Sequence, residues 1–106
     1  MKYSSEYFKD IQKNYPKVAA GFDRLSKEIS EAGPLDKKTQ IMVKIGVCIG
    51  LGSEGNLQNL TKQALAEGVS KEEIRHAILL ATTTAGFPSM IVAMQWAGDV
   101  LPGSKK

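Results

Sequence analysis

The sequence has one cysteine, one histidine and no apolar run long enough to cross a membrane. Cys48 alone cannot close an intrachain disulfide, and one cysteine with one histidine cannot form a Cys2His2-type zinc site. We therefore expect no metal and no cofactor. The longest apolar segment, residues 41–51, is shorter than the roughly 20 residues of a membrane span. The N-terminus also has no apolar segment of the kind found in secretory signals. These absences favour a cytoplasmic protein.

The excess of positive charge is small. The chain has 14 Lys and Arg residues and 11 Asp and Glu residues, which leave a net charge of +3. Acids and bases alternate along most of the sequence. Basic residues stand next to each other at Lys37–Lys38 and Lys105–Lys106, whereas nucleic-acid binding requires many of them on one face. We expect neither a nucleic acid nor a membrane as a partner.

The periodic segments are all typical of helices, and no alternating strand pattern of useful length interrupts them. In the first half of the chain, Ser4 or Ser5 is placed to cap a short helix, and Pro16 begins a second one. The second helix ends at Gly33–Pro34, and Asp36 is the expected N-cap of a third helix that continues to about Leu51.

The second half of the sequence contains further signals for helix starts. Ser53 is the expected N-cap of a fourth helix, and Ser70 with Glu73 has the spacing of a capping box for a fifth. A sixth helix is expected from about Pro88 to Leu101. The sequence therefore predicts an all-α bundle of about six helices in a single domain. It comprises N-terminal helices over residues 1–33, a core over 34–101 and a tail over 102–106.

Apolar residues at steps of three and four predict the buried face of each helix. In the second helix this face is formed by Val18, Phe22, Leu25 and Ile29. In the fifth and sixth helices the expected buried residues are Ile74, Ala77, Ile78, Leu79, Leu80, Ala81, Ile91, Met94, Ala97 and Leu101. Trp96, Met90 and Met94 are expected in the core or in a subunit interface.

The third helix is apolar around its whole circumference. Its apolar residues are Ile41, Met42, Val43, Ile45, Val47, Cys48 and Ile49. Such a helix is expected to be buried on nearly all sides. A chain of 106 residues has limited volume to enclose it, so we expect it to be central and also to contribute to a subunit interface.

Three blocks of sequence resemble the carboxymuconolactone decarboxylase family, which includes the alkyl hydroperoxide reductase D type proteins. They are Leu-Asp-Lys-Lys-Thr-Gln-Ile-Met from Leu35, Gln-Ala-Leu-Ala-Glu-Gly-Val-Ser-Lys-Glu-Glu-Ile from Gln63, and Ala-Gly-Phe-Pro-Ser from Ala85. The resemblance covers residues 34–101. It implies an all-helical subunit of the alkyl hydroperoxide reductase D fold that assembles into trimers or hexamers.

The functional residues of that family are not matched. Peroxidase-type members carry a glutamate, a Cys-x-x-Cys pair and a histidine, at the positions that hold Ile41, Ser53, Asn56 and Leu60 here. Thiol redox chemistry needs a thiolate, a resolving thiol and a base. Decarboxylase-type members carry Gly-Arg-x-x-Glu-Phe-x-x-His, of which this chain keeps Gly52 alone. The catalytic residues, if there are any, are therefore unknown from the sequence.

Four residues remain as candidates to contact a ligand, namely Lys44, Cys48, Glu54 and Asn56. Lys44 lies in an apolar helix, where it must reach water or find an anion such as Glu54. Cys48 is expected to be a buried, inert thiol with a raised pKa. His76 is expected in solvent or at an interface, and the hydroxyls of Thr82, Thr83 and Thr84 are expected to bond to the preceding turn.

Our interpretation is an oligomeric, small-molecule-binding protein without the peroxidase, disulfide reductase or decarboxylase activity of its relatives. One alternative is an enzyme of altered peroxiredoxin-type or lactone decarboxylase-type chemistry. It would use Glu54 as acid or base, Lys44 as cation and Cys48 as thiol. A second alternative is a module for protein–protein interaction.

Overall fold

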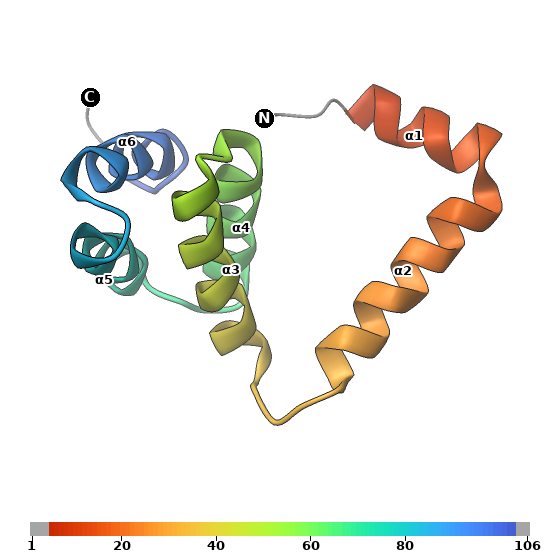
Figure 1. The fold of residues 1–106 in the computed structure, drawn as a ribbon, viewed down its shortest axis with the longest axis horizontal. Helices are drawn as coiled ribbons and strands as arrows, with labels where there is room; N and C mark the ends of the chain where they lie inside the picture. Colours follow the sequence, from red (N-terminus) through yellow and green to blue (C-terminus); the bar gives the residue numbers. More distant parts are fainter. Residues whose placement is uncertain (1–4, 104–106) are drawn as a thin grey trace. The chain divides into compact units, whose positions relative to one another are not determined.

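A computed structural model describes residues 5–103, which are folded into six α-helices and one short 3-10 helix without any strand (Figure 1). The chain divides into two compact units, one ending at Leu35 and the other beginning at Asp36. The predicted all-helical architecture is confirmed. The Ser4 cap and the Lys105–Lys106 pair lie outside the described residues. No helix in the described range is long and apolar enough to cross a membrane.

The first unit is a hairpin of two helices, α1 (Ser5–Asn14) and α2 (Pro16–Glu31), which pack against each other. Proline begins α2 because its fixed φ suits a first helical turn and its missing N–H has no helical partner there. A hollow of about 420 Å³ on this hairpin is lined by apolar residues of both helices, namely Tyr7, Phe8, Ile11, Val18, Ala19 and Phe22.

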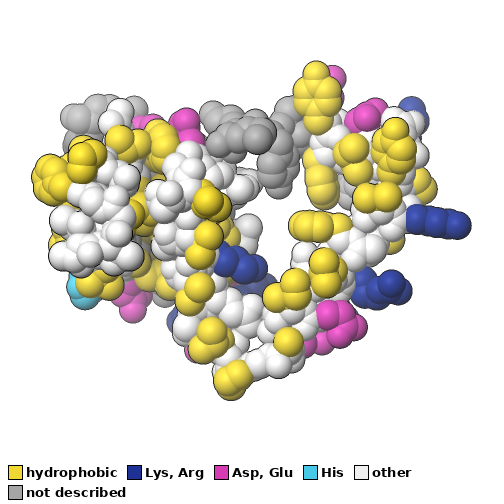
Figure 2. Space-filling view, in the orientation of Figure 1, with side chains coloured by type: hydrophobic (Ala, Val, Ile, Leu, Met, Phe, Trp, Pro, Cys, Tyr) yellow, Lys and Arg dark blue, Asp and Glu magenta, His cyan; other side chains and the backbone are white. Residues whose placement is uncertain are grey.

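The prediction of a buried stripe on α2 is wrong for this chain. No residue of α2 is buried, and the side chains of the stripe are between 56% and 64% exposed, namely Val18, Phe22, Leu25 and Ile29. Figure 2 shows apolar side chains open on both helices of the hairpin. The spacing identifies an apolar face correctly. Two helices alone, however, do not have enough surface to cover it.

The second unit contains α3 (Lys37–Leu51), α4 (Glu54–Ala66), α5 (Lys71–Leu80), the 3-10 helix η1 (Ala81–Thr83) and α6 (Phe87–Gly98). α3 packs against α4, α5 and α6, and α4 also packs against α6. The core comprises Ile41, Ile45, Cys48, Ile49, Leu57, Ala64, Val69, Ile74, Ile78, Met90, Ala93, Ala97 and Leu101. Each buried CH₂ group in it contributes about 0.8 kcal/mol to stability.

Local hydrogen bonds begin α3 and α5 where the sequence predicts. The carboxylate of Asp36 accepts a 2.8 Å bond from the backbone N–H of Thr39, which lowers the pKa of Asp36. Ser70 and Glu73 form the full capping box. The backbone N–H of Ser70 donates to Glu73 at 2.8 Å, which lowers the pKa of Glu73, and Ser70 Oγ accepts at 3.0 Å from the Glu73 N–H. Ser53 occupies the N-cap of α4, but its side chain makes no capping bond.

The expected burial of α3 on nearly all sides is wrong. Ile41, Ile45, Cys48 and Ile49 are buried, whereas Val43 and Val47 are about half exposed. The helices of this unit cover one side of α3, and its opposite apolar side faces outward. The subunit interface expected there stays a prediction.

The buried faces of α5 and α6 also differ from the prediction. α5 ends at Leu80 and passes into η1, and Leu79 and Leu80 are exposed rather than buried. α6 begins at Phe87, because Gly86, at φ 103°, turns the chain in a conformation that L side chains rarely adopt. α6 is nearly all apolar, so its spacing does not identify one inner face. Met90 and Ala93 are buried with Ala97, and Ile91 is exposed.

Candidate functional site

The four positions that the resemblance assigns to catalysis carry no thiol, imidazole or carboxylate. Ile41 is buried in the core on α3, and Ser53 is buried at the N-cap of α4. Asn56 is exposed one turn further along α4, and Leu60 is partly buried against the core. Ser53 and Asn56 have no group that ionises near neutral pH, and the side chains of Ile41 and Leu60 are hydrocarbon. These four positions therefore carry no residue that transfers electrons or protons readily.

Cys48 lies in the core on the inner side of α3. Its side chain is 7% exposed, and burial raises the pKa of its thiol. A raised pKa keeps the group in the thiol form, whereas nucleophilic attack and metal binding require the thiolate. The predicted burial of Cys48 and its raised pKa are confirmed, and the inertness of its thiol stays a prediction.

The other ligand candidates do not form a common cluster. Lys44 and Asn56 are exposed, and Glu54 is partly buried in the first turn of α4. Within the described part of the chain no ion pair joins Lys44 to Glu54, whereas Lys37 pairs with Glu67 at 3.5 Å. Lys44 therefore reaches solvent, which agrees with the interpretation that its ammonium lies in water rather than against Glu54.

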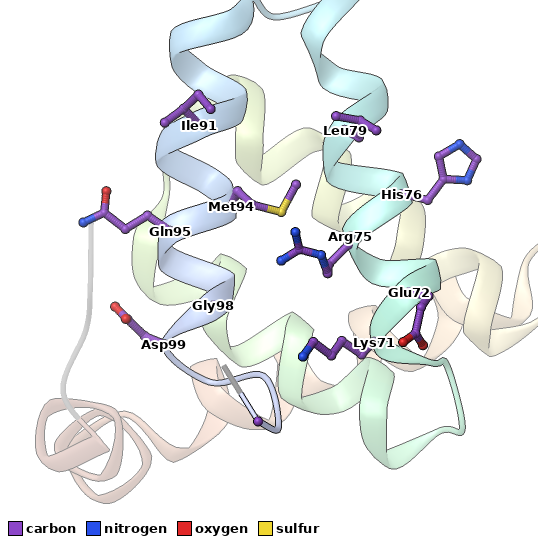
Figure 3. A pocket seen from close by; sticks show the side chains of 11 residues that line it. Lys71, Glu72, Arg75, His76, Leu79, Ile91, Met94, Gln95, Gly98 and Asp99 are labelled. Carbon is purple, nitrogen blue, oxygen red and sulfur yellow. The ribbon is translucent and has the colours of Figure 1, made fainter. Parts of the chain in front are cut away.

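A groove of about 890 Å³ lies between α5 and α6, outside the region that the resemblance indicates. Its lining residues are Lys71, Glu72, Arg75, His76, Leu79, Ile91, Met94, Gln95, Gly98, Asp99 and Gly103. Figure 3 shows the Arg75 guanidinium and the Lys71 ammonium between the two helices. Pockets of roughly 300–1,000 Å³ accommodate small-molecule ligands in proteins.

Sequence reasoning did not identify this groove. Lys71 and Arg75 are four residues apart, so they lie on one face of α5, and that spacing was the available signal. His76 is exposed on the same helix, and its ring points away from α6 in Figure 3. The hydroxyls of Thr82 and Thr83 donate to the carbonyls of Leu79 and Leu80 at 2.7 and 3.5 Å, as predicted for structural threonines.

A smaller groove of about 220 Å³ lies where the C-terminal end of α3 meets α6. It is lined by Ile49, Gly52, Pro88, Ser89, Val92 and Trp96. The side-chain amide of Gln58 donates to the carbonyl of Trp96 at 3.0 Å, which ties α4 to α6 near this point. With one hydroxyl and no charged group, this groove has little capacity to orient a polar ligand. Residues 5–103 also contain no group of three His, Cys, Asp or Glu side chains able to hold a metal ion.

Residues 16–99 match the model of the carboxymuconolactone decarboxylase family. The match includes α2, which lies outside the range of 34–101 indicated by the three sequence blocks. Two uncharacterised proteins of Methanocaldococcus jannaschii are similar to this chain. One is 30% identical over 91 residues, covering 86% of this chain and 85% of the relative. The other is 28% identical over 94 residues, covering 88% and 90%.

One similar protein has an activity in its name. The 4-carboxymuconolactone decarboxylase of Acinetobacter baylyi is 33% identical over 66 residues, which cover 62% of this chain and 49% of that enzyme. This chain thus aligns with about half the length of that relative. The similarity concerns shared ancestry, since the acid and base positions discussed above carry other residues in this chain.

Proposed function

Because this chain belongs to the carboxymuconolactone decarboxylase family, we propose that it is a cytoplasmic homo-oligomer that binds a small molecule and does not catalyse the family's reactions. The observation that carries the proposal is the replacement of the family's acid, thiols and base by Ile41, Ser53, Asn56 and Leu60. The remaining thiol, Cys48, is buried with a raised pKa, which opposes a peroxidase role.

Self-association is supported by the amount of apolar surface that a single chain leaves open. The hairpin exposes the apolar stripe of α2, and α3 exposes a second stripe formed by Val43, Val47 and Leu51. Contiguous apolar surface of this kind marks an interaction site in soluble proteins. We propose that copies of the chain cover these surfaces for one another in a trimer or hexamer.

The alternative of an altered enzyme has less support. It requires Glu54, Lys44 and Cys48 to act on one substrate, yet Lys44 is exposed and Cys48 is buried in the core. Glu54, in the first turn of α4, is also the kind of residue that stabilises a helix N-terminus.

A module for binding a different protein would use the same exposed apolar stripes of α2 and α3 as self-association. The two interpretations differ in whether a second copy of the chain or another protein covers these stripes.

A thermal-shift screen of the purified protein tests the binding role. A ligand that binds only the folded state raises the melting temperature by mass action. At a concentration of a hundred times its Kd, it adds about 2.7 kcal/mol to the free energy of unfolding. We expect a concentration-dependent shift with at least one class of metabolite. An unchanged melting temperature with organic acids, phosphates, amines and neutral metabolites at millimolar concentration would favour the protein-interaction module instead.

A further inference from the structure

We propose that the groove between α5 and α6 binds a small amphiphilic anion, whose negatively charged head lies at Arg75 and Lys71 and whose apolar part lies along Leu79, Ile91 and Met94. This inference rests on the proposed small-molecule-binding function and assigns it a place and a ligand class. The groove is formed by the second unit of the chain alone.

Two cations of α5 line the groove. Lys71 and Arg75 are one turn apart on α5, and in Figure 3 both head groups lie in the space between α5 and α6. Lys71 Nζ donates to the backbone carbonyl of Pro102 at 3.1 Å, which holds the ammonium at one end of the groove. An ammonium has three donors, so this bond leaves others for a ligand.

The groove also contains Glu72 and Asp99, but in Figure 3 their carboxylates point away from the space where the Arg75 guanidinium lies. Among residues 5–103 no carboxylate lies within ion-pair distance of Arg75. A guanidinium presents five donors in a planar fork that fits carboxylate and phosphate groups. The groove therefore offers an anion a cation that no carboxylate in the described chain already occupies.

One side of the groove is apolar. The thioether of Met94 points toward Arg75 in Figure 3, and Leu79 and Ile91 continue the apolar lining toward the other end of the groove. Leu79 and Ile91 are both about half exposed, so they retain apolar surface that a ligand can cover. A fully hydrophilic anion would leave that surface in water, and an apolar neutral molecule would leave the Arg75 guanidinium without an anion. An amphiphilic anion can contact both the cations and the apolar lining of the groove.

Carboxylate and phosphate heads share this chemistry, so the experiment uses both. Octanoate, octyl phosphate and the neutral analogue octanamide are titrated into the protein at neutral pH, with affinity measured by calorimetry and the location by amide chemical-shift changes. We expect one or both anions to bind with shifts on α5 and α6. Octanamide should bind at least roughly tenfold more weakly, because hydrogen bonds to charged groups contribute about 1.5–3 kcal/mol.

Two variants with the same change of charge localise the site. R75Q removes the guanidinium from the groove and is expected to weaken binding of the anions roughly tenfold or more while leaving octanamide unaffected. K62Q removes an exposed cation on α4 that does not line the groove, and its affinity should equal that of the parent. A third variant, L79N, removes apolar surface and should weaken octanoate binding. In this background R75Q should reduce the octanoate affinity by the same factor as it does in the parent.

The inference is overturned if octanamide binds as tightly as octanoate, if R75Q keeps the parent affinity, or if the chemical-shift changes map away from α5 and α6. Its failure is distinguishable from failure of the proposed function. A metabolite from the thermal screen that binds R75Q normally and is not displaced by octanoate would sink the anion groove while small-molecule binding stands. Catalytic turnover dependent on Cys48 would sink the proposed function while the groove affinities remained as measured.

Discussion

Replacing Phe22 with aspartate is expected to convert the proposed oligomer into a monomer. Phe22 lies in the middle of the exposed apolar stripe on α2 and also lines the apolar hollow of the hairpin. If a second copy covers this face, an aspartate there must lose its hydration or prevent the contact, and an unpaired buried carboxylate costs several kcal/mol. The loss of an aromatic side chain from an interface removes about 1.5–3 kcal/mol more.

The measurement is the mass in solution by light scattering coupled to size-exclusion chromatography. The parent should have three or six times the chain mass of 11.5 kDa, and F22D should elute at 11.5 kDa. A20D is the matched control, because Ala20 is exposed on the same helix about half a turn away from Phe22. It should keep the mass of the parent. A monomeric parent, or an F22D variant of unchanged mass, would refute self-association through the hairpin.

Cys48 is expected to react with a thiol-alkylating reagent at least about a hundred times more slowly in the native protein than in the denatured one. Its side chain is 7% exposed in the core, and burial raises the pKa of the thiol, so both access and the thiolate fraction are reduced. Modification then requires the unit to open, which costs up to the global stability of about 5–15 kcal/mol. The rate is followed by mass spectrometry with iodoacetamide near pH 8.

An exposed cysteine provides the comparison. In a C48A background, a cysteine in place of Leu79 stands at a position that is about half exposed on α5. It should be alkylated in the native protein nearly as fast as after denaturation. Native Cys48 reacting at a comparable rate would show an accessible thiolate, and the assignment of Cys48 to the inert core would then be wrong.

Local signals in the sequence predicted the helix starts correctly because the interactions that begin a helix span only three or four residues. Asp36 bonds to the N–H of Thr39, and Ser70 and Glu73 bond to each other, so the relevant partners are neighbours in the sequence. The start of α2 at Pro16 follows from the geometry of proline itself. The burial of Cys48 was predictable in the same way, since aliphatic residues surround it on α3.

Burial and the groove depend on how helices pack together, and a periodic pattern does not contain that information. Phe22 and Ile91 have the spacing of buried residues but are exposed in the single chain. Apolar spacing identifies the apolar face of a helix, but it does not show whether that face packs in a core or lies on an exposed surface. The packing of α5 against α6 forms the groove and places Arg75 beside Met94, which lies nineteen positions later in the sequence. The spacing of Lys71 and Arg75 was visible, but nothing local indicated the opposing wall.

We propose that the residues of this chain at the family's reaction centre do not support peroxidase, disulfide reductase or decarboxylase activity. The decisive measurement is peroxide consumption in the presence of a dithiol reductant, on the parent and on C48A under identical conditions. We predict rates for both proteins that equal the rate without protein, because no thiolate with a neighbouring base is present in the described chain. A parent rate clearly above background that disappears in C48A would contradict the claim.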